Sequence, residues 1–226
     1  MVDIYIVRHC EARGNIDRIF HGRYDSDISE NGRLQLERLS ERFKDIPLDA
    51  VYSSPLKRTR LTADAVNLHH GLPVVIRDEL IEINGGYMEN RPWSDMPKVN
   101  PEDARRWNLE PHLFAAEGGE AMADVYKRIS AAVLAIAAEN GGKTVAVATH
   151  GCAIRNLICW AEGRPIEQLY EVDWCDNTGV SLLRFDDELR PQVVFKNDVS
   201  HLSEDAMTLK KQNWWKPENL KKLKFD

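Results

Sequence analysis

The stretch Ile4-Tyr5-Ile6-Val7-Arg8-His9 joins an unbroken apolar run, rich in β-branched residues, to two basic side chains at its end. Such a run is typical of a central parallel strand that is buried on both faces of a sheet. In open α/β sheets, ligands bind beyond the carboxyl ends of the strands. Arg8 and His9 are therefore predicted to lie at a ligand-binding edge.

Other short apolar segments predict the rest of the sheet. Residues 144–149 form a second strong strand, and residues 49–53 and 74–76 are weaker candidates. Residues 180–185 and 192–195 are separated by the turn residues Asp186-Asp187-Glu188, which favours an antiparallel pair.

Helices are predicted in the intervals between the strands. Ser29 is a plausible N-cap for the first, and Ser54-Pro55 predicts the start of a second that continues to about Leu68. An apolar stripe from Met122 to Ile136 predicts a third, ended by Gly141-Gly142, and residues 152–162 a fourth. This alternation indicates an α/β fold of three α/β/α layers, with a mostly parallel central sheet and helices on both faces.

The composition is ordinary for a soluble globular protein and excludes several other classes. The chain has 226 residues, 30 Lys plus Arg and 36 Asp plus Glu, so its formal charge of −6 gives no reason to expect nucleic acid or an acidic membrane as partner. No apolar run approaches the roughly 18 residues of a membrane span. We expect one domain over residues 1–226, and no heptad repeat indicates an oligomeric state.

The cysteines and the amino-terminal residues indicate the cellular compartment of the protein. The four cysteines at 10, 152, 159 and 175 form no Cys-x-x-Cys pair. The chain begins without the basic and apolar regions of a secretory signal. A cytoplasmic protein with reduced thiols is expected.

Two segments stand apart from the alternating pattern. Residues 85–118 hold four prolines and predict a mostly irregular, lid-like insertion with one short helix. Its apolar residues either form a wall for a substrate's leaving group or merely pack the insertion onto the sheet: Tyr87, Met88, Trp93, Met96 and Trp107. Residues 210–226 carry six lysines, which indicates either a solvated tail or a basic flap near a phosphate site.

Polar residues follow three of the predicted strands. His150-Gly151 ends the strand over 144–149 and leads into a helix, and Arg58 lies in the first turn of the helix after residues 49–53. Helix N-termini attract anions through their unpaired N–H groups and positive dipole end. Together with Arg8 and His9, these residues predict a phosphate pocket.

The same residues belong to a longer series of phrases that spans residues 4 to about 156. The phrases are Val7-Arg8-His9-Cys10-Glu11-Ala12 with Asn15, Phe20-His21-Gly22-Arg23, Ser53-Ser54-Pro55-Leu56-Lys57-Arg58, Leu80-Ile81-Glu82-Ile83, Gly118-Gly119-Glu120 and Ala148-Thr149-His150-Gly151. As a set they resemble the histidine phosphatase superfamily, which includes cofactor-dependent phosphoglycerate mutases and many small-molecule phosphatases. The resemblance implies a phosphoglycerate-mutase-like fold.

The resemblance also implies a role for each residue of the pocket. His9 would be the nucleophile that forms a phosphohistidine, and Arg8, Arg58 and His150 would hold the phosphate oxygens. Glu82 would protonate the leaving oxygen and then take a proton from water. The implied phosphate- and substrate-binding residues are Asn15, His21, Gly22, Arg23 and Gly151. No metal and no cofactor are implied, because arginines and histidines supply the positive charge.

Departures from the family pattern leave alternatives open. Cys10 stands where the family has glycine, so a non-catalytic phosphate-binding relative is one alternative. Cys10 and Cys152 could also be a redox-sensitive pair whose pKa values the cationic pocket lowers, or simply two inert buried thiols.

Two further alternatives concern the reaction. A phosphoglycerate mutase would need an arginine pair, and Arg105-Arg106 is interpreted as a solvated helix face. A zinc site of His9, Glu82 and His150 is disfavoured because Arg8 and Arg58 would repel the metal ion. We expect a metal-independent phosphomonoester hydrolase that acts on a small-molecule phosphate ester, whose identity the sequence does not specify.

Overall fold

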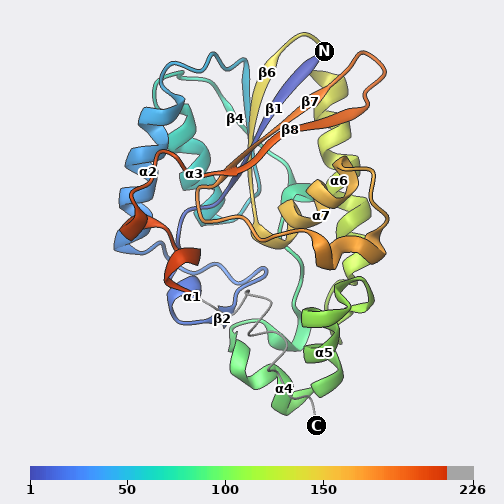
Figure 1. The fold of residues 1–226 in the computed structure, drawn as a ribbon. Coiled ribbons are helices and arrows are strands. Elements are labelled where there is room, and N and C mark those ends of the chain that lie inside the picture. Colours follow the sequence, from blue (N-terminus) through green and yellow to red (C-terminus); the bar gives the residue numbers. More distant parts are fainter. Residues whose placement is uncertain (213–226) are drawn as a thin grey trace.

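The computed structural model describes residues 1–212 of the chain. Six strands within them form one sheet in the order β4-β3-β6-β1-β7-β8 (Figure 1). Their bounds are Val2–Arg8 (β1), Ala50–Ser53 (β3), Val74–Ile76 (β4), Thr144–Thr149 (β6), Val180–Phe185 (β7) and Pro191–Asp198 (β8). The first four strands of that order are parallel to one another. β7 is antiparallel to β1, and β8 is antiparallel to β7. The predicted strands and the late antiparallel pair are thus confirmed.

The central strand β1 is buried on both faces, as its apolar run predicts. Ile4 and Ile6 belong to the core between the sheet and one pair of helices, while Tyr5 and Val7 pack in the core of the opposite face. Edge strand β8 instead alternates between half-buried and exposed residues along most of its length. This difference is the expected signature of a central strand and a sheet edge.

Four long helices cover the two faces of the sheet. α2 (Glu30–Phe43) and α3 (Lys57–Asn67) lie on one side, and α6 (Met122–Glu139) and α7 (Gly151–Ala161) on the other (Figure 1). The three-layer α/β/α architecture is therefore confirmed. Ser29 caps α2 as predicted, since its side chain accepts a hydrogen bond from the backbone N–H of Gly32 at 2.9 Å.

The predicted start of α3 at Ser54-Pro55 is wrong. The helix begins at Lys57, and its N-cap is Leu56, which makes no side-chain cap. The reason is that the Ser54 hydroxyl is engaged elsewhere, 2.7 Å from Nε2 of His150.

The insertion over residues 85–118 is more regular than predicted. It contains two short helices, α4 (Met96–Val99) and α5 (Pro101–Leu109), because Asn100 separates them and caps the second through the N–H of Asp103 at 3.1 Å. Its strand β5 (Arg91–Pro92) pairs with β2 (Ile19–Phe20). Figure 1 shows α4 and α5 beyond the end of the sheet where β1 finishes.

The remaining elements are short. α1 spans Arg13–Ile16, and short 3-10 helices occupy Asp78–Leu80 (η1), Gly86–Met88 (η2), Trp93–Asp95 (η3), Pro111–Leu113 (η4), Ile166–Glu171 (η5), Glu204–Ala206 (η6) and Leu209–Lys211 (η7). Of the Lys-rich segment expected at 210–226, the residues after Gln212 lie outside the described part of the chain.

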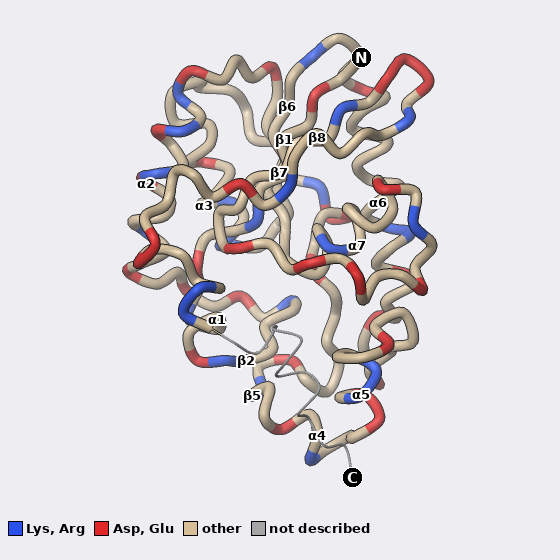
Figure 2. Tube along the Cα trace, viewed as in Figure 1, with Lys and Arg blue, Asp and Glu red and all other residues tan. Residues whose placement is uncertain are grey.

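Charged residues are interspersed along the described chain (Figure 2). Many form exposed ion pairs, such as Arg190 with Asp186 at 2.7 Å. Exposed pairs contribute about 0–1 kcal/mol each, so the stability of the fold rests mainly on its apolar core. Among residues 1–212, no helix combines the length and the apolar character that crossing a bilayer requires.

Candidate active site

Two neighbouring parallel strands deliver two histidines to one place. β1 pairs with β6 so that Arg8 lies opposite Thr149, and the N–H of His9 donates to the Thr149 carbonyl at 2.9 Å. The next residue after Thr149 is His150, and the ring centroids of His9 and His150 are 5.3 Å apart. The strand-end arrangement expected from the sequence is therefore present.

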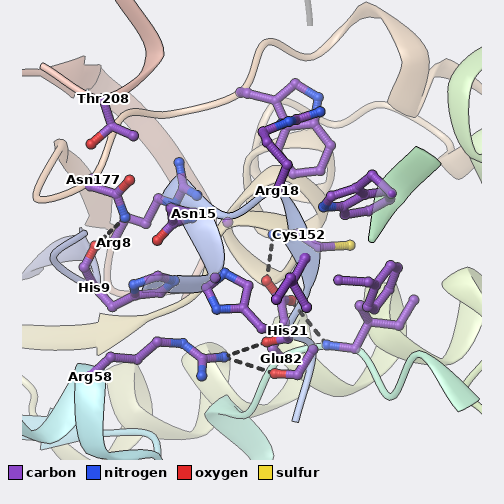
Figure 3. A pocket seen from close by; sticks show the side chains of 18 of the residues that line it. Arg8, His9, Asn15, Arg18, His21, Arg58, Glu82, Cys152, Asn177 and Thr208 are labelled. Atoms are coloured by element: carbon purple, nitrogen blue, oxygen red, sulfur yellow. Dashed lines mark hydrogen bonds between the residues drawn. The ribbon is translucent and has the colours of Figure 1, made fainter. Parts of the chain in front are cut away.

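A pocket opens at this edge of the sheet, and Figure 3 shows side chains that line it. Its polar lining comprises Arg8, His9, Asn15, Arg18, His21, Arg58, Glu82, Asn177, Thr208 and Gln212. A second group, here called the aromatic wall, consists of Phe20, Trp93, Trp107 and Trp174. The pocket thus combines a cationic part with an aromatic part.

The hydrogen bonds of His9 define its tautomer. Nδ1 lies 2.7 Å from the carbonyl oxygen of Cys10, which can only accept, so Nδ1 carries the proton. Nε2 then bears the lone pair. The backbone carbonyl of His9 accepts from the side-chain amide of Asn177 at 2.9 Å, which fixes the loop on its other side.

His9 is held in its neutral form by its surroundings. Its side chain is almost completely buried, and this burial lowers its pKa well below 6.5. The positive charges of Arg58 and Arg8 lower the pKa further. Burial likewise lowers the pKa values of His21 and His150 well below 6.5. A neutral imidazole with a free Nε2 is a competent nucleophile.

Arg58 is fully buried and holds the loop that carries His21. Its Nη atoms donate to the backbone carbonyls of His21, Gly22 and Tyr24 at 2.8–2.9 Å. Burial lowers the pKa of Arg58 to about 10, so it keeps its positive charge at neutral pH. Gly22 permits this close packing, because a Cβ there would lie 2.2 Å from the carbonyl oxygen of Ile83.

Among residues 1–212, three buried nitrogens near His9 have no hydrogen-bond partner. They are Nε of Arg8, Nε of Arg58 and Nδ1 of His150. Burying a donor without a partner costs about 1–3 kcal/mol, and more for a charged group. Arg8 is fixed in place, since its Nη1 donates to the Cys175 carbonyl at 2.6 Å. The arrangement is suited to an anion that would accept from all three donors.

Glu82 follows η1 in the chain, and its carboxylate lies against the N-terminus of α7. One carboxylate oxygen accepts from the N–H of Cys152 at 2.9 Å, and the other from the N–H groups of Ala153 and Ile83 at 3.0 Å. Burial raises the pKa of Glu82, while these bonds and the Arg58 charge oppose the rise. Opposing influences of this kind leave a carboxyl group able to give and to take a proton. Gly151 precedes these residues, and a Cβ there would lie 3.1 Å from Nε of Arg8.

The other residues expected to bind substrate fall into two groups. Asn15, His21, Gly22 and Gly151 line the pocket, and the rings of His21 and His9 are 5.8 Å apart. Arg23 is not brought into the pocket: it is exposed, and its Nη2 lies 3.4 Å from Glu120. The backbone N–H of Arg23 donates to Glu89, which turns the chain outward at this point. His150 lies against His9 without belonging to the pocket lining.

The thiols do not behave as the redox hypothesis requires. Burial raises the pKa of Cys10 to about 12 and raises that of Cys152 well above its usual value. The expectation that the cationic pocket lowers both pKa values is therefore wrong. Cys10 is not part of the pocket lining, and its sulfur lies 4.0 Å from the Arg58 carbonyl oxygen. Its side chain therefore does not crowd the pocket.

Some apolar residues of the insertion line the pocket, and others pack the insertion onto the sheet. Trp93 and Trp107 line the pocket, whereas Met88 and Met96 are fully buried in the core. Tyr87 donates through its hydroxyl to Asp103 at 2.9 Å.

Several pocket residues were not singled out from the sequence. They come from β2 and its approach, from the loop before β7 and from the chain after β8: Arg18, Phe20, Trp174, Asn177, Thr208, Leu209 and Gln212. One signal could have found Asn177. Because β7 runs antiparallel to β1, the residues just before β7 must lie at the edge where β1 ends.

Comparison with known proteins gives consistent matches. The sequence profile of the histidine phosphatase superfamily (branch 1) matches residues 4–199. Phosphoserine phosphatase 1 of Hydrogenobacter thermophilus is 33% identical over 205 residues, which cover 90% of this chain and 96% of the relative. Phosphoglycerate mutase-like protein 4 of Arabidopsis thaliana is 31% identical over 205 residues, which cover 89% and 87%.

Solved structures match in fold as well. Bacillus stearothermophilus YhfR superposes with a TM-score of 0.86 and 29% identity, over 90% of this chain and 100% of that one. A phosphoserine phosphatase from Entamoeba histolytica, solved with phosphoserine, gives a TM-score of 0.80 at 21% identity, over 90% and 100%.

The depressed pKa of His9 predicts a pH dependence of stability. The unfolded chain binds a proton at His9 below about pH 6.5 and the folded chain does not, so stability falls as the pH is lowered through this range. In urea unfolding between pH 6 and 5, His9→Gln should lose this contribution, up to about 1.4 kcal/mol per pH unit. Equal slopes for the wild type and the variant would contradict the buried, neutral state of His9.

Proposed function

Because the chain belongs to the histidine phosphatase superfamily, we propose that it hydrolyses small-molecule phosphate monoesters through a phosphohistidine at His9. The observation that carries the proposal is the set of three unpartnered donors around a histidine whose Nε2 is free. Arginine suits phosphate because its planar group donates to two oxygens at once.

In the first step, Nε2 of His9 attacks phosphorus in line with the ester oxygen. The P–N bond forms as the P–O bond to the leaving group breaks, and the carboxyl group of Glu82 gives its proton to the departing oxygen. Arg8, Arg58 and His150 take up the charge on the other phosphate oxygens. The Cys10 carbonyl stabilises the imidazolium through Nδ1–H.

In the second step, water attacks the phosphohistidine. The Glu82 carboxylate takes a proton from this water, the P–N bond breaks, and inorganic phosphate leaves with His9 restored. When the Ser54 hydroxyl donates to Nε2 of His150, Nδ1 of His150 carries the proton and can donate to a phosphate oxygen. Asn15, His21, Gly22 and Gly151 complete the phosphate end of the pocket.

Hydrolysis is favoured over phosphoglycerate mutase activity by the position of the arginine pair. Arg105 and Arg106 form ion pairs with Glu102 on α5, and neither lines the pocket. A purely binding role is disfavoured because His9 and Glu82 are both poised for chemistry, which phosphate binding alone does not require.

The proposal also covers the metal requirement and the cellular compartment of the enzyme. We expect turnover without a metal ion, since Arg8 and Arg58 carry the positive charge that a cation would otherwise supply. The four cysteines are buried and free, which suits a reducing compartment such as the cytoplasm.

His9→Ala should lower the turnover of p-nitrophenyl phosphate by roughly 10⁴-fold or more, because the nucleophile is lost. EDTA should leave the wild-type rate unchanged. His70→Ala is a matched control, because that histidine bonds to the Phe43 carbonyl and lies outside the pocket lining. The proposal fails if His9→Ala keeps its rate or if EDTA abolishes wild-type turnover.

Glu82→Gln should distinguish between leaving groups. Turnover of an alkyl phosphate should fall by roughly 10²–10³-fold, because an alkoxide needs a proton as it departs. The fall should be smaller for p-nitrophenyl phosphate, whose leaving group is stable as an anion. A melting curve controls for the hydrogen bond lost at the start of α7. An equal loss on both substrates would rule out the assignment of Glu82 as the acid.

A further inference from the structure

The aromatic wall is a cluster of four rings in mutual contact, contributed by four separate segments. Phe20 of β2 lies 4.6 Å from Trp93 and 5.4 Å from Trp107, measured between ring centroids. Trp93 and Trp107 are 5.1 Å apart, and Trp174 stacks on Trp107 at 6.1 Å with an interplanar angle of 28°. Such distances are those of favourable aromatic pairs.

Neighbouring side chains hold two rings of the aromatic wall in place. The guanidinium of Arg155 lies 4.9 Å from the ring centroid of Trp174, and its Nε donates to the Val172 carbonyl at 2.7 Å. Phe114 packs edge-on against Trp107 at 4.8 Å. A binding surface whose rings are already fixed loses little conformational entropy when a ligand binds.

The wall is also tied to the phosphate end of the pocket. Trp174 is followed by Cys175, whose carbonyl accepts from Nη1 of Arg8. The leaving group of an ester held by Arg8 would therefore lie close to these rings. In Figure 3, Arg18 stands apart from Arg58, on the other side of the pocket.

The charges of the lining disfavour a cationic leaving group. Among the described lining residues, Glu82 is the one acid, and its carboxylate already accepts three backbone N–H groups. Arg18 adds a positive charge to the pocket. An ammonium group, as in an amino acid phosphate, would find no carboxylate to pair with in this part of the chain.

We propose that the aromatic wall selects phosphate monoesters whose leaving group presents an aromatic ring. This inference rests on the proposed phosphatase function and adds the class of substrate to it. The residues that determine specificity are Trp93 and Trp174, the two half-exposed members of the wall.

The test compares two esters with similar alkoxide leaving groups, 2-phenylethyl phosphate and n-propyl phosphate. Their intrinsic reactivity is similar, so a difference in kcat/KM reports binding of the ring in the transition state. The wild type should prefer the phenylethyl ester by roughly 10-fold or more. Phosphoserine, which carries an ammonium group, should fall below the phenylethyl ester.

Variants of the wall connect this preference to particular residues. Trp93→Ala and Trp174→Ala should each reduce the ratio of kcat/KM for the two esters toward one. Trp160→Ala is the matched control, because that residue packs on Phe185 and is not part of the pocket lining. Its ratio should equal that of the wild type. If an alanine variant does not fold, Trp93→Leu and Trp174→Leu keep apolar volume and remove the ring.

The outcomes separate this inference from the proposed function. A wild-type ratio near one, or a ratio that no wall variant changes, overturns the inference, whereas hydrolysis of both esters that disappears in His9→Ala upholds the function. If neither of these esters nor p-nitrophenyl phosphate is hydrolysed, the function fails. Calorimetry with 2-phenylethylphosphonate and n-propylphosphonate then decides on the wall alone: tighter binding of the phenylethyl compound supports its selectivity, and equal binding overturns it.

Discussion

The register between β1 and its two neighbours is the constraint on which the site depends. Parallel pairing with β6 sets Arg8 opposite Thr149, so His9 and His150 emerge side by side. Antiparallel pairing with β7 brings the chain before β7 to the same edge, where Asn177 donates to the His9 carbonyl. A slip of one residue would turn each of these side chains to the opposite face of the sheet.

The site holds its positive charge on buried arginine side chains. Arg58 is completely buried, and the terminal nitrogens of its guanidinium are occupied by backbone carbonyls, so its charge is fixed in position before any ligand arrives. Burial keeps His9 neutral, and the Arg58 charge adds to this effect; the same charge partly offsets the effect of burial on Glu82. Such preorganisation costs folding stability, because Nε of Arg8 and Nδ1 of His150 are buried without a hydrogen-bond partner among residues 1–212.

Strand-end residues could be predicted from the sequence because the signal is local. Arg8, His9 and His150 each follow a recognisable apolar strand, and Arg58 lies in the first turn of the helix after another; the family resemblance added Glu82. The aromatic wall could be predicted only in part, since Phe20 and Trp174 reach the pocket through tertiary packing of distant segments. The prediction that Ser54 caps α3 was wrong for a similar reason, because the Ser54 hydroxyl bonds to the distant His150 and not to the backbone at the start of the helix. The thiol hypothesis failed because the depth of burial, and not the nearby cations, sets the pKa of Cys10.

The central step of the proposed mechanism is the transfer of the phosphoryl group to His9 during turnover. Rapid mixing with p-nitrophenyl phosphate, quenching in alkali, where phosphohistidine persists, and mass spectrometry of the digest would test it directly. We predict a phosphoryl group on the peptide that contains His9 and none in His9→Ala. Turnover at full rate with no phosphorylated peptide, or with the group on His21 or His150, would contradict it.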